Sequence, residues 1–454
     1  MTAPVCKPNI IVFFTDQQRW DTTGIHGNPL GLTPNFDRMA AYGTHVEHAF
    51  TCQPVCGPAR SCLQTGVYAT TSGCYKNGIP LPDTLDTLGD HFKRAGYRTG
   101  YIGKWHLAAE EPVPADKRQG YEYWLASNIL EFTSDAYSTV VYDKDSNPVR
   151  LPGYRVDALT DAAIRYVDGH QEEPFFLFVS YLEPHHQNHI DNYPTPTGYG
   201  EQYAGRWLPP DLAALGGSVY QHAGGYYGMV KRLDEALGRL LDALKSLDLE
   251  ENTIVLFTSD HGNHFKTRNE EYKRSCHEGS IRVPMAFTGP GFSRGRKLAE
   301  LVSLIDLPPT LLEAAGIEAP DYMQGRSILP LVKGKGEAAT EPWPEEVFVQ
   351  ISESSVARAI RTRKWKYGVV AEGKDGNRQP GSDVYTETFL YDLETDPYEL
   401  TNLAGLDSHR EAADVLKARL LRRIVEAGEI APVIMNAPAR AGGQRKVTPQ
   451  EAKR

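Results

Sequence analysis

The chain has 454 residues, enough to bury a large core, and its length predicts one large domain with a smaller one beside it. Hydrophobic residues make up 41% and charged residues 23%, as in ordinary globular proteins, while the net charge of −10 argues against nucleic acid as the main partner. An anionic substrate remains compatible with that charge, because local cations can oppose the global sign.

The first residues lack the pattern of an export signal. Residues 1–8 carry no basic segment followed by a long apolar one, and the apolar run at residues 10–14 is too short to span a membrane. We therefore expect a cytoplasmic protein with no membrane partner. Six cysteines in so long a chain do not predict a disulfide framework, so reduced thiols are expected: Cys6, Cys52, Cys56, Cys62, Cys74 and Cys276.

Four short apolar runs are predicted to be strands buried on both faces, because their apolar residues follow one another without alternation. They span residues 9–15, 99–103, 175–180 and 252–259. Polar residues that can carry chemistry follow each run: in chain order, Asp16-Gln17, Lys104-Trp105-His106, His185-His186 and Asp260-His261.

Helical patterns lie between these runs, at residues 84–95, 156–167 and 229–247. The last is the clearest, with Leu233, Leu237 and Leu240 on one face and charged residues off it. Strands that alternate with helices predict an α/β fold. In such sheets ligands bind beyond the carboxyl ends of the strands, so one shared site is expected there.

The sequence changes character after about residue 331. Residues 333–344 are rich in Gly, Glu and Pro and predict a linker. Four short strands then follow, and a helix is expected at residues 410–427. We predict a catalytic α/β domain at residues 1–335, an α+β subdomain at residues 345–435 and a flexible tail at residues 436–454.

The segment Cys56-Gly57-Pro58-Ala59-Arg60-Ser61 carries a thiol at the start of a predicted short helix, with an arginine four residues later. A helix N-terminus and a nearby Arg lower a thiol pKa, which makes Cys56 a candidate nucleophile. A buried cysteine without a chemical role is the alternative. The segment alone does not decide between them.

Two pairs at strand ends, Asp16-Gln17 and Asp260-His261, are candidate metal ligands. An oxygen-rich set with one imidazole suits Ca²⁺, Mg²⁺ or Mn²⁺ better than zinc. Each Asp could instead be a turn residue or a helix cap. A thiolate metal site at Cys52 and Cys56 is disfavoured, because no second pair at zinc-ribbon spacing exists.

Several cationic or imidazole side chains also follow predicted strands or lie near the other motifs. Taken singly, each could be a solvated or core residue, but together they suggest a clamp for a tetrahedral oxyanion. They are Arg60, Lys104, His106, His185, His186, Lys273 and His277.

Residues 56–60, followed by Thr65-Gly66, resemble the C-x-P-x-R signature of type I sulfatases, members of the alkaline phosphatase superfamily. The resemblance covers nearly the whole chain, and its ordered series of motifs is far more specific than any single one. The further matches are Asp16-Gln17, Thr33-Pro34-Asn35, Gly103-Lys104-Trp105-His106-Leu107, Pro184-His185, Asp260-His261-Gly262, Lys273 through Pro284, Arg363 through Tyr367, and Leu390 through Pro397.

The resemblance implies an alkaline-phosphatase-like α/β fold with a large mixed sheet flanked by helices and a smaller C-terminal subdomain with an antiparallel sheet. It implies that a maturation enzyme oxidises Cys56 to formylglycine, whose hydrate attacks sulfur, releases the alcohol and then expels sulfate. One divalent cation would acidify that hydrate, with Ca²⁺ expected and Mg²⁺ or Mn²⁺ as alternatives. Its ligands would be Asp16, Gln17, Asp260, His261 and residue 56.

The resemblance also assigns roles to the remaining motif residues. Arg60 would orient the nucleophile, while Lys104 and Lys273 would clamp sulfate oxygens. His106 would act as the base of the second step, and His185 or Lys273 would protonate the departing alcohol. Asn77 would also contact the sulfate, and His277 would serve as an additional acid or substrate contact.

Departures from the commonest sulfatase pattern leave the substrate open. Gln17 replaces a frequent Asp, and His261 a frequent Asn, as in the subset with phosphonate monoester hydrolases and choline sulfatases. Ala59 replaces the usual Ser of the signature, and His277 a common Tyr.

The leading hypothesis is a hydrolase for a sulfated carbohydrate or small organosulfate. The alternatives are a phosphonate monoester or phosphodiester hydrolase and, if Cys56 stays a thiol, a sulfated-glycan binding protein. Exo or endo action and the oligomeric state stay open. Residues that could contact a sugar are Arg19, Trp20, His186, His189, Arg268 and Glu270.

Overall fold

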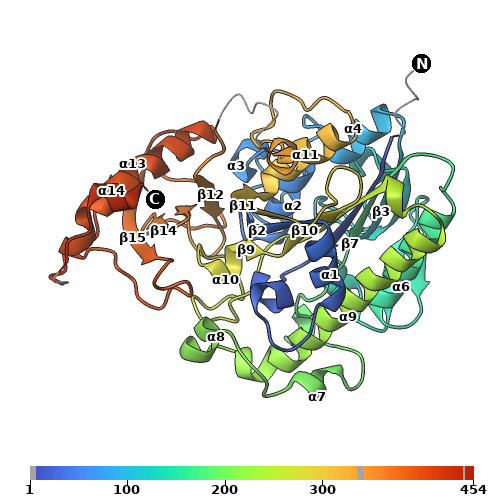
Figure 1. The fold of residues 1–454 in the computed structure, drawn as a ribbon, viewed down its shortest axis with the longest axis horizontal. Helices are drawn as coiled ribbons and strands as arrows, with labels where there is room; N and C mark the ends of the chain where they lie inside the picture. Colours follow the sequence, from blue (N-terminus) through green and yellow to red (C-terminus); the bar gives the residue numbers. More distant parts are fainter. Residues whose placement is uncertain (1–6, 335–341, 443–444, 454) are drawn as a thin grey trace.

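The computed structural model describes residues 7–334, 342–442 and 445–453. Its strands form two sheets, of which the larger is drawn at the centre of Figure 1. This sheet has eleven strands in the order β11 (Arg296–Ser303), β2 (Thr44–Phe50), β10 (Met285–Thr288), β8 (Thr253–Ser259), β1 (Asn9–Thr15), β7 (Phe175–Ser180), β3 (Arg98–Lys104), β4 (Tyr123–Ser127), β5 (Thr139–Tyr142) and β6 (Pro148–Leu151), with β9 (Arg282–Val283) paired to β2.

The four predicted strands are confirmed as β1, β3, β7 and β8, and they are neighbours at the centre of the sheet. β1 pairs in parallel with β7 and β8, and β3 pairs in parallel with β7 and β4. β10 runs antiparallel to β8, so the sheet is mixed. Because the four central strands are parallel, the polar residues after them meet at one edge.

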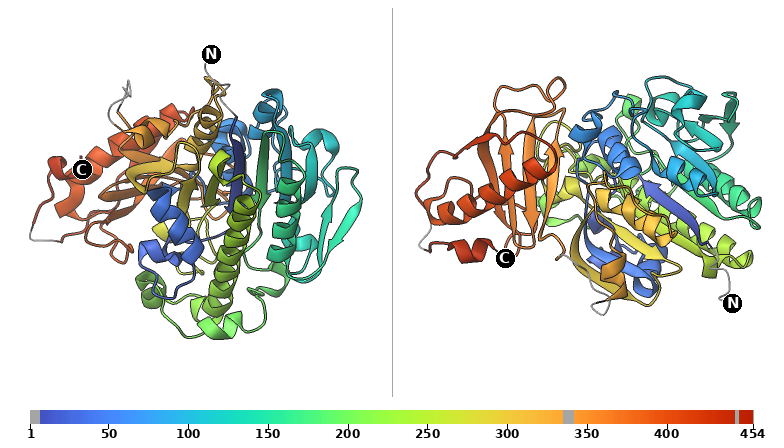
Figure 2. Two further views of the ribbon diagram at one scale, coloured as in Figure 1. Left: turned by 45° about the vertical axis from the view of Figure 1, so that its right-hand side comes forward. Right: turned by 90° about the horizontal axis from the view of Figure 1, so that it is seen from above.

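Helices cover both faces of this sheet, as Figures 1 and 2 show. Ile10, Val12 and Phe14 of β1 pack into one core, and Ile11 and Phe13 pack into another on the opposite face. The helices of the first core are α2 (Cys56–Thr65), α4 (Leu88–Arg94), α11 (Leu307–Ala314) and α12 (Leu329–Lys333). Those of the second are α1 (Pro34–Tyr42), α6 (Arg155–Asp168) and α9 (Val219–Ser246). Burial on both faces explains why the strands are apolar throughout.

Helix α9 begins ten residues before the predicted start at residue 229. Gly224, Gly225 and Gly228 lie in the added turns, and glycine weakens a helix prediction because of its low propensity. The structure shows why they are there. A Cβ at Gly224 would lie 2.6 Å from the Gly200 carbonyl oxygen, so the segment that contains the short helix α7 (Tyr199–Tyr203) approaches too closely for a side chain.

The C-terminal sheet has five strands in the order β12 (Glu346–Ile351), β13 (Ala357–Thr362), β14 (Trp365–Val370), β15 (Val384–Asp392) and β16 (Val433–Met435). The first four are antiparallel, as expected from the family resemblance, whereas β16 joins parallel to β15. Helix α13 (Arg410–Glu426) packs on this sheet. The other helices are α3 (Ala69–Ser72), α5 (Leu130–Thr133), α8 (Pro210–Leu215), α10 (Glu278–Ile281) and α14 (Pro449–Ala452).

The C-terminal segment differs from the flexible tail expected at residues 436–454. In its described part, Val447 and Ala452 are buried against the C-terminal core, and the Trp365 indole Nε1 donates to the Glu451 carbonyl at 2.9 Å. Thr448 and Glu451 cap α14 reciprocally. Two small apolar residues among many charges gave too weak a signal to predict this packing. Most of the predicted linker, residues 335–341, lies outside the described residues, and the domain boundaries stay a prediction.

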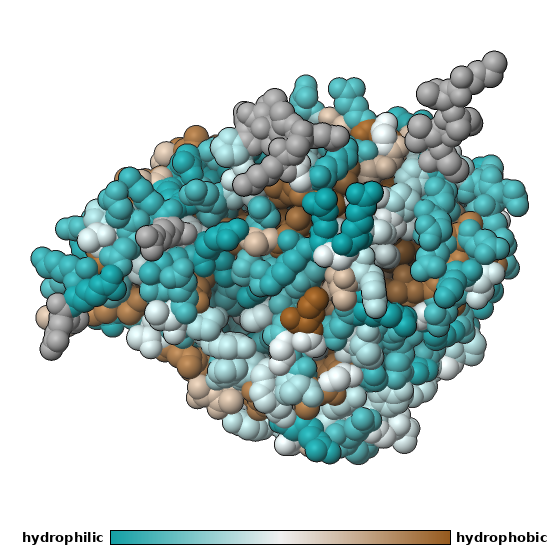
Figure 3. Space-filling model, viewed as in Figure 1, coloured by the Kyte–Doolittle hydropathy of each residue, from teal (hydrophilic) through white to brown (hydrophobic). Residues whose placement is uncertain are grey.

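Among the described helices, none has both the length and the apolar character that crossing a bilayer requires. On the face drawn in Figure 3, hydrophilic residues predominate and hydrophobic ones form small scattered groups. The cytoplasmic location stays a prediction. The described cysteines, Cys52, Cys56, Cys62, Cys74 and Cys276, form no disulfide in the structure, and their reduced state stays a prediction.

A buried ionic network joins the two parts of the molecule. The Lys366 Nζ of β14 lies 3.0 Å from Glu278 Oε1 of α10 and 2.8 Å from Glu399 Oε1. Replacing Lys366 with Met should lower the free energy of unfolding by about 3–5 kcal/mol, because buried Glu399 loses its paired ammonium group and buried Glu278 loses the nearest of its cations, keeping Arg361 and Arg282. Urea unfolding measures this. Lys364→Met is the matched control and should cost less than about 1 kcal/mol, since its partners Asp392 and Glu394 lie 3.6 and 3.4 Å away nearer the surface. Equal losses would contradict the role of Lys366.

His45 on β2 gives stability a pH dependence. Burial, followed by the charge of Lys297, lowers the pKa of His45 from 6.5 to about 4. The unfolded chain therefore binds more protons between pH 6.5 and 4, so the contribution of His45 is lost as pH falls through that window. His45→Asn should flatten the fall in unfolding free energy between these pH values. Parallel urea titrations of both proteins would show the difference, and identical slopes would rule it out.

Candidate active site

Side chains from the ends of β1 and β8 and from the start of α2 converge at one edge of the large sheet. Ligand atoms of Asp16, Cys56, Asp260 and His261 all lie within 4.8 Å of one another, and all four residues are buried. Four of the five predicted metal ligands are therefore brought together. Within the described residues, this is the group of His, Cys, Asp and Glu that could hold an ion.

Gln17 is held in a left-handed backbone conformation with a φ of 68°. Its backbone N–H donates to Asp260 Oδ1 at 3.0 Å, and the Tyr226 hydroxyl donates to its carbonyl at 2.8 Å. These two bonds fix a conformation that would otherwise be unfavourable. The side-chain Oε1 accepts from Lys273 Nζ at 3.3 Å.

Cys56 is the first residue of α2, a helix whose residues are all buried. Its Sγ lies 2.9 Å from Lys273 Nζ, 3.2 Å from His261 Nε2 and 3.6 Å from Asp16 Oδ1. Burial alone would raise the pKa of this thiol, but the charges of Lys104 and Lys273, with that of His261, outweigh it and hold the pKa well below its usual range. The environment favours an anion or a strongly polar group at position 56.

Arg60 lies one turn further along α2 and is 2% exposed. One guanidinium nitrogen donates to Asp16 Oδ2 at 3.0 Å and to Asp260 Oδ2 at 3.3 Å, and the other donates to the Ser180 hydroxyl at 2.6 Å. The arginine thus bridges the ends of β1, β7 and β8. It fixes the two carboxylates on which any cation would sit.

Lys104 ends β3 with its Nζ 2.9 Å from Asp16 Oδ2 and 2.8 Å from Glu131 Oε1. Glu131 is a site residue that the sequence analysis missed. It is 3% exposed, and its Oε1 also lies 3.8 Å from His106 Nδ1. Burial would raise the pKa of Glu131, but Lys104 and His106 outweigh it and lower this pKa. Its position just after β4 was the signal that could have identified it.

The Lys273 Nζ also contacts His185 Nε2 at 3.0 Å, so a lysine and an imidazole stand together above Cys56. The other ring nitrogen of His185 pairs with the His186 carbonyl at 2.6 Å, which orients the ring. Burial, and then the charge of Lys273, lowers the pKa of His185. The structure therefore brings the predicted lysine, histidine and thiol into one cluster.

A cavity of about 440 Å³ opens above this cluster. Asn77 lies beside it, with its Oδ1 accepting from the Gly57 N–H at 2.9 Å and its own N–H donating to Glu353 Oε1 at 2.7 Å. Glu353 comes from the loop after β12, so the C-terminal part of the chain forms one wall of the cavity. The sequence analysis missed Glu353, although it follows a predicted strand. The lining is Cys56, Asn77, His106, Glu131, Phe132, His185, His186, Asn188, Glu271, Tyr272, Lys273, Arg274, Glu353 and Asn377.

His277 lies apart from the residues around Cys56. Its ring nitrogens pair with the Ser275 and Tyr391 hydroxyls at 3.2 and 3.1 Å, and it lines a second cavity of about 230 Å³. His186 lines the main cavity. The other candidate sugar contacts do not line this cavity. Arg19 pairs with Asp21 and Asp211, and the Trp20 ring lies against the Arg282 guanidinium. His189 pairs with Asp135, Arg268 donates to two backbone carbonyls, and Glu270 is exposed.

The donor set fits a hard divalent cation. Asp16 and Asp260 are fully buried side by side, and burial together with the Asp16 carboxylate raises the pKa of Asp260. A divalent charge between them would relieve that repulsion. The His261 Nδ1 pairs with the Gly262 carbonyl at 2.9 Å, so Nε2 is the ring atom that faces the centre. Oxygen at position 56 would complete a set suited to Ca²⁺ or Mg²⁺.

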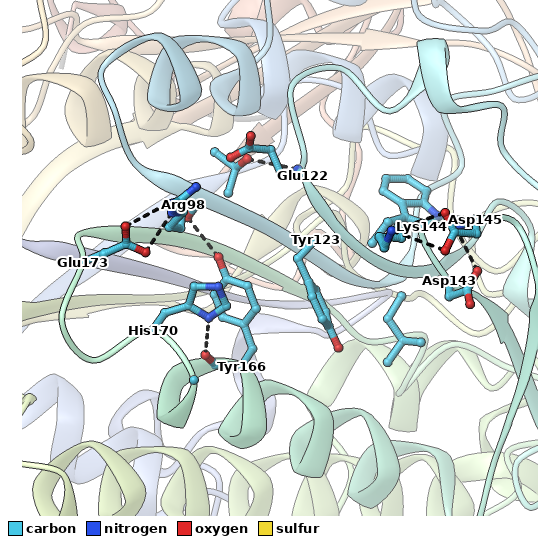
Figure 4. Close-up of a pocket in the computed structure, with 13 residues that line it drawn as sticks. Arg98, Glu122, Tyr123, Asp143, Lys144, Asp145, Tyr166, His170 and Glu173 are labelled. Atoms are coloured by element: carbon cyan, nitrogen blue, oxygen red, sulfur yellow. Dashed lines mark hydrogen bonds and ion pairs between the residues drawn. The ribbon is translucent and has the colours of Figure 1, made fainter.

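A larger cavity of about 570 Å³ lies at the opposite, amino ends of β3 and β4. Figure 4 shows its lining, in which Arg98 pairs with Glu173 and the Tyr166 hydroxyl donates to the Arg98 carbonyl. It contains none of the predicted site residues. We therefore do not assign the active site to this cavity, although it is larger than the cavity above Cys56.

Comparison with known proteins assigns this chain to a family. The family model described as Sulfatase matches residues 8–317, which is more than half of the chain. The chain belongs to the sulfatase family. A second model, N-sulphoglucosamine sulphohydrolase, C-terminal, matches residues 271–426. As a sulfatase the protein is a hydrolase of sulfate esters, which confirms the resemblance inferred from the motifs.

Two relatives and one solved structure illustrate the similarity. The ulvan-active sulfatase of Formosa agariphila is 31% identical over 93% of this chain and 82% of its own length. The arylsulfatase of Clostridium perfringens is 28% identical over 92% of this chain and 94% of its own. The structure of yidJ from Bacteroides fragilis superposes with a TM-score of 0.81 at 25% identity, covering 94% of this chain and 98% of that one. The fold is therefore the alkaline-phosphatase-like fold of sulfatases.

Proposed function

We propose that this sulfatase hydrolyses the sulfate ester of a sulfated carbohydrate or small organosulfate, with formylglycine derived from Cys56 as its nucleophile. The observation that carries the proposal is the convergence of Asp16, Asp260, His261 and Lys273 on Cys56. The ulvan-active relative supports a carbohydrate substrate. We also propose that a formylglycine-generating enzyme acts on this chain.

We propose that Asp16, Gln17, Asp260, His261 and residue 56 hold one divalent cation, Ca²⁺ or else Mg²⁺ or Mn²⁺. When bound, the cation supplies positive charge that acidifies the nucleophile and offsets charge on the sulfate. Arg60 keeps the two carboxylates in place for it through the 3.0 and 3.3 Å contacts.

The remaining residues act on the sulfate and on protons. Lys104 and Lys273 present ammonium groups to the sulfate oxygens, and Asn77 positions the start of α2 through the Gly57 N–H. His185, paired with Lys273, is placed to protonate the leaving alcohol, and His106 to accept a proton in the second step. In this proposal His277 has no contact with sulfate, because it pairs with Ser275 and Tyr391.

Two measurements test this proposal. The first is the intact mass of the peptide around Cys56, in which an aldehyde replaces sulfur by oxygen and carries two hydrogens fewer. The second compares rates on nitrophenyl sulfate and on a nitrophenyl phosphonate monoester. A modified residue and faster sulfate hydrolysis support the proposal. Faster phosphonate hydrolysis favours the alternative hydrolase, and an unmodified thiol without turnover favours sulfated-glycan binding.

A further inference from the structure

The mouth of the active-site cavity differs in charge from its floor. Among the described residues that line this cavity, the lysine and arginine side chains are Lys273 and Arg274. Lys273 points to the floor, where its Nζ contacts Cys56 Sγ at 2.9 Å. Arg274 is therefore the lining cation that could meet the part of a substrate beyond its sulfate.

Arg274 is already committed to two carboxylates. One guanidinium nitrogen lies 2.6 Å from Glu271 Oε2, and the other lies 2.5 Å from Glu353 Oε2. Glu353 is in turn fixed by the Asn77 N–H at 2.7 Å. Two carboxylates around one guanidinium leave this part of the mouth with a net negative charge.

Four other lining residues are uncharged. Asn188, Asn377 and Tyr272 offer amide and hydroxyl groups, and the Phe132 side chain is 61% exposed there. The face of an exposed phenyl ring attracts an ammonium group more than it attracts an anion. Neither the amides nor the ring provides a counter-ion for a second sulfate or a carboxylate.

The neighbouring cavity, which shares Arg274 as a lining residue, does not supply a free cation either. The two terminal nitrogens of Arg268 donate to the carbonyls of Glu399 and Tyr398 at 2.9 and 2.8 Å. Arg358 pairs with Glu429 at 2.7 Å. The guanidinium groups on that side are thus engaged by the protein itself.

We infer that this site selects sulfate esters whose leaving alcohol is neutral or positively charged, and that it discriminates against alcohols that carry a second anionic group. The inference rests on the proposed function and narrows its substrate class to singly sulfated sugars, amino sugars or amino alcohols. A second anion at the mouth would face Glu271 and Glu353 with its own charge unpaired, which disfavours binding and the transition state alike.

Three aryl sulfates test this inference. Each is 4-nitrophenyl sulfate with one added meta group, either a carboxamide, a carboxylate or an aminomethyl group, and each enzymatic rate is divided by the uncatalysed rate. We expect kcat/KM for the carboxylate to fall at least tenfold below that for the carboxamide, and the aminomethyl compound to match or exceed the carboxamide. Added salt should shrink these differences, because the mouth is open to solvent.

The possible outcomes distinguish a failure of the charge selection from a failure of the proposed function. Turnover of all three compounds at equal corrected rates, or preference for the carboxylate, overturns the charge selection while leaving sulfate hydrolysis intact. No turnover of any compound by protein with modified Cys56 overturns the proposed function and this inference with it.

Charge-neutral variants test which residues are responsible. Glu271→Gln should raise relative kcat/KM for the carboxylate compound several-fold, because Arg274 then keeps part of its charge for the substrate. Glu353→Gln should act in the same direction, with its stability measured alongside because Glu353 also holds Asn77. Glu122→Gln, at the remote cavity of Figure 4, should leave the ratio unchanged. An unchanged ratio in both the Glu271 and Glu353 variants contradicts the inference.

Discussion

Replacing Cys56 with alanine should reduce sulfatase activity by roughly 10⁴-fold or more, the scale seen when an enzyme loses its nucleophile. Cys56 is 1% exposed, and its Sγ lies 2.9 Å from Lys273 Nζ and 3.2 Å from His261 Nε2. Among the described residues, it is the nucleophilic side chain at this position. The lysines and the imidazole would still bind sulfate. We therefore expect kcat to collapse while inorganic sulfate still binds, measured by initial rates and by calorimetric titration.

Cys62→Ala is the matched control for this variant. Cys62 lies on the same helix and is equally buried, but it packs in the core of the C-terminal sheet rather than above the site. Its loss should lower stability and leave kcat nearly unchanged. Comparable losses of activity in both variants would show that the helix, and not the side chain at position 56, is what matters.

Replacing Asp16 with Asn should affect cation binding, stability and activity together. The Asp16 Oδ2 accepts from Arg60 at 3.0 Å and from Lys104 at 2.9 Å, and its Oδ1 faces Cys56. Burial opposes ionisation, but Lys104, His185 and Arg60 hold the pKa of Asp16 below its usual range, so a charged ligand is lost. We expect Ca²⁺ affinity to fall more than tenfold and kcat/KM by about 10³-fold, as for other sites that lose a central electrostatic group.

Without Asp16 the cations Arg60 and Lys104 keep fewer buried partners, which should cost about 3–5 kcal/mol of unfolding free energy. Asp234→Asn is the control. Asp234 is a buried carboxylate that accepts from the N–H groups of Asn35 and Phe36 at the start of α1, and burial raises its pKa to about 6. The Asp234→Asn variant should therefore be less stable than the wild type while its kcat stays unchanged. Calcium titration by calorimetry and urea unfolding distinguish the two, and wild-type calcium affinity in Asp16→Asn would refute its role as a ligand.

The sequence was sufficient to predict the centre of the fold, because β1, β3, β7 and β8 are apolar on both faces and few other structures accept such runs. Strands β2 and β11 were not predicted, since His45, Glu47 and His48 interrupt the apolar residues of β2, and Lys297 and Glu300 those of β11. The start of α9 was missed because glycines placed for close packing look like breaks in a helix.

The floor of the site was predictable for a related reason. Asp16, Lys104 and Asp260 come directly after or at the end of parallel strands, so their meeting follows from the topology. Glu131 and Glu353 were missed although both follow strands, because Glu131 lies in the short helix α5 after the unpredicted strand β4 and Glu353 comes from the C-terminal sheet. His277 was assigned by motif order alone, and its contacts with Ser275 and Tyr391 arise from the C-terminal sheet.

Helix α2 is shared between the two parts of the molecule. Ala59 and Leu63 pack under the large sheet, whereas Cys62 packs among Phe348 and Ile360 of the C-terminal one. Helix α2, which carries residue 56, therefore packs against the large sheet and the C-terminal sheet at the same time. We therefore expect that a chimera joining this catalytic half to the C-terminal half of a distant relative would displace that helix, and residue 56 with it.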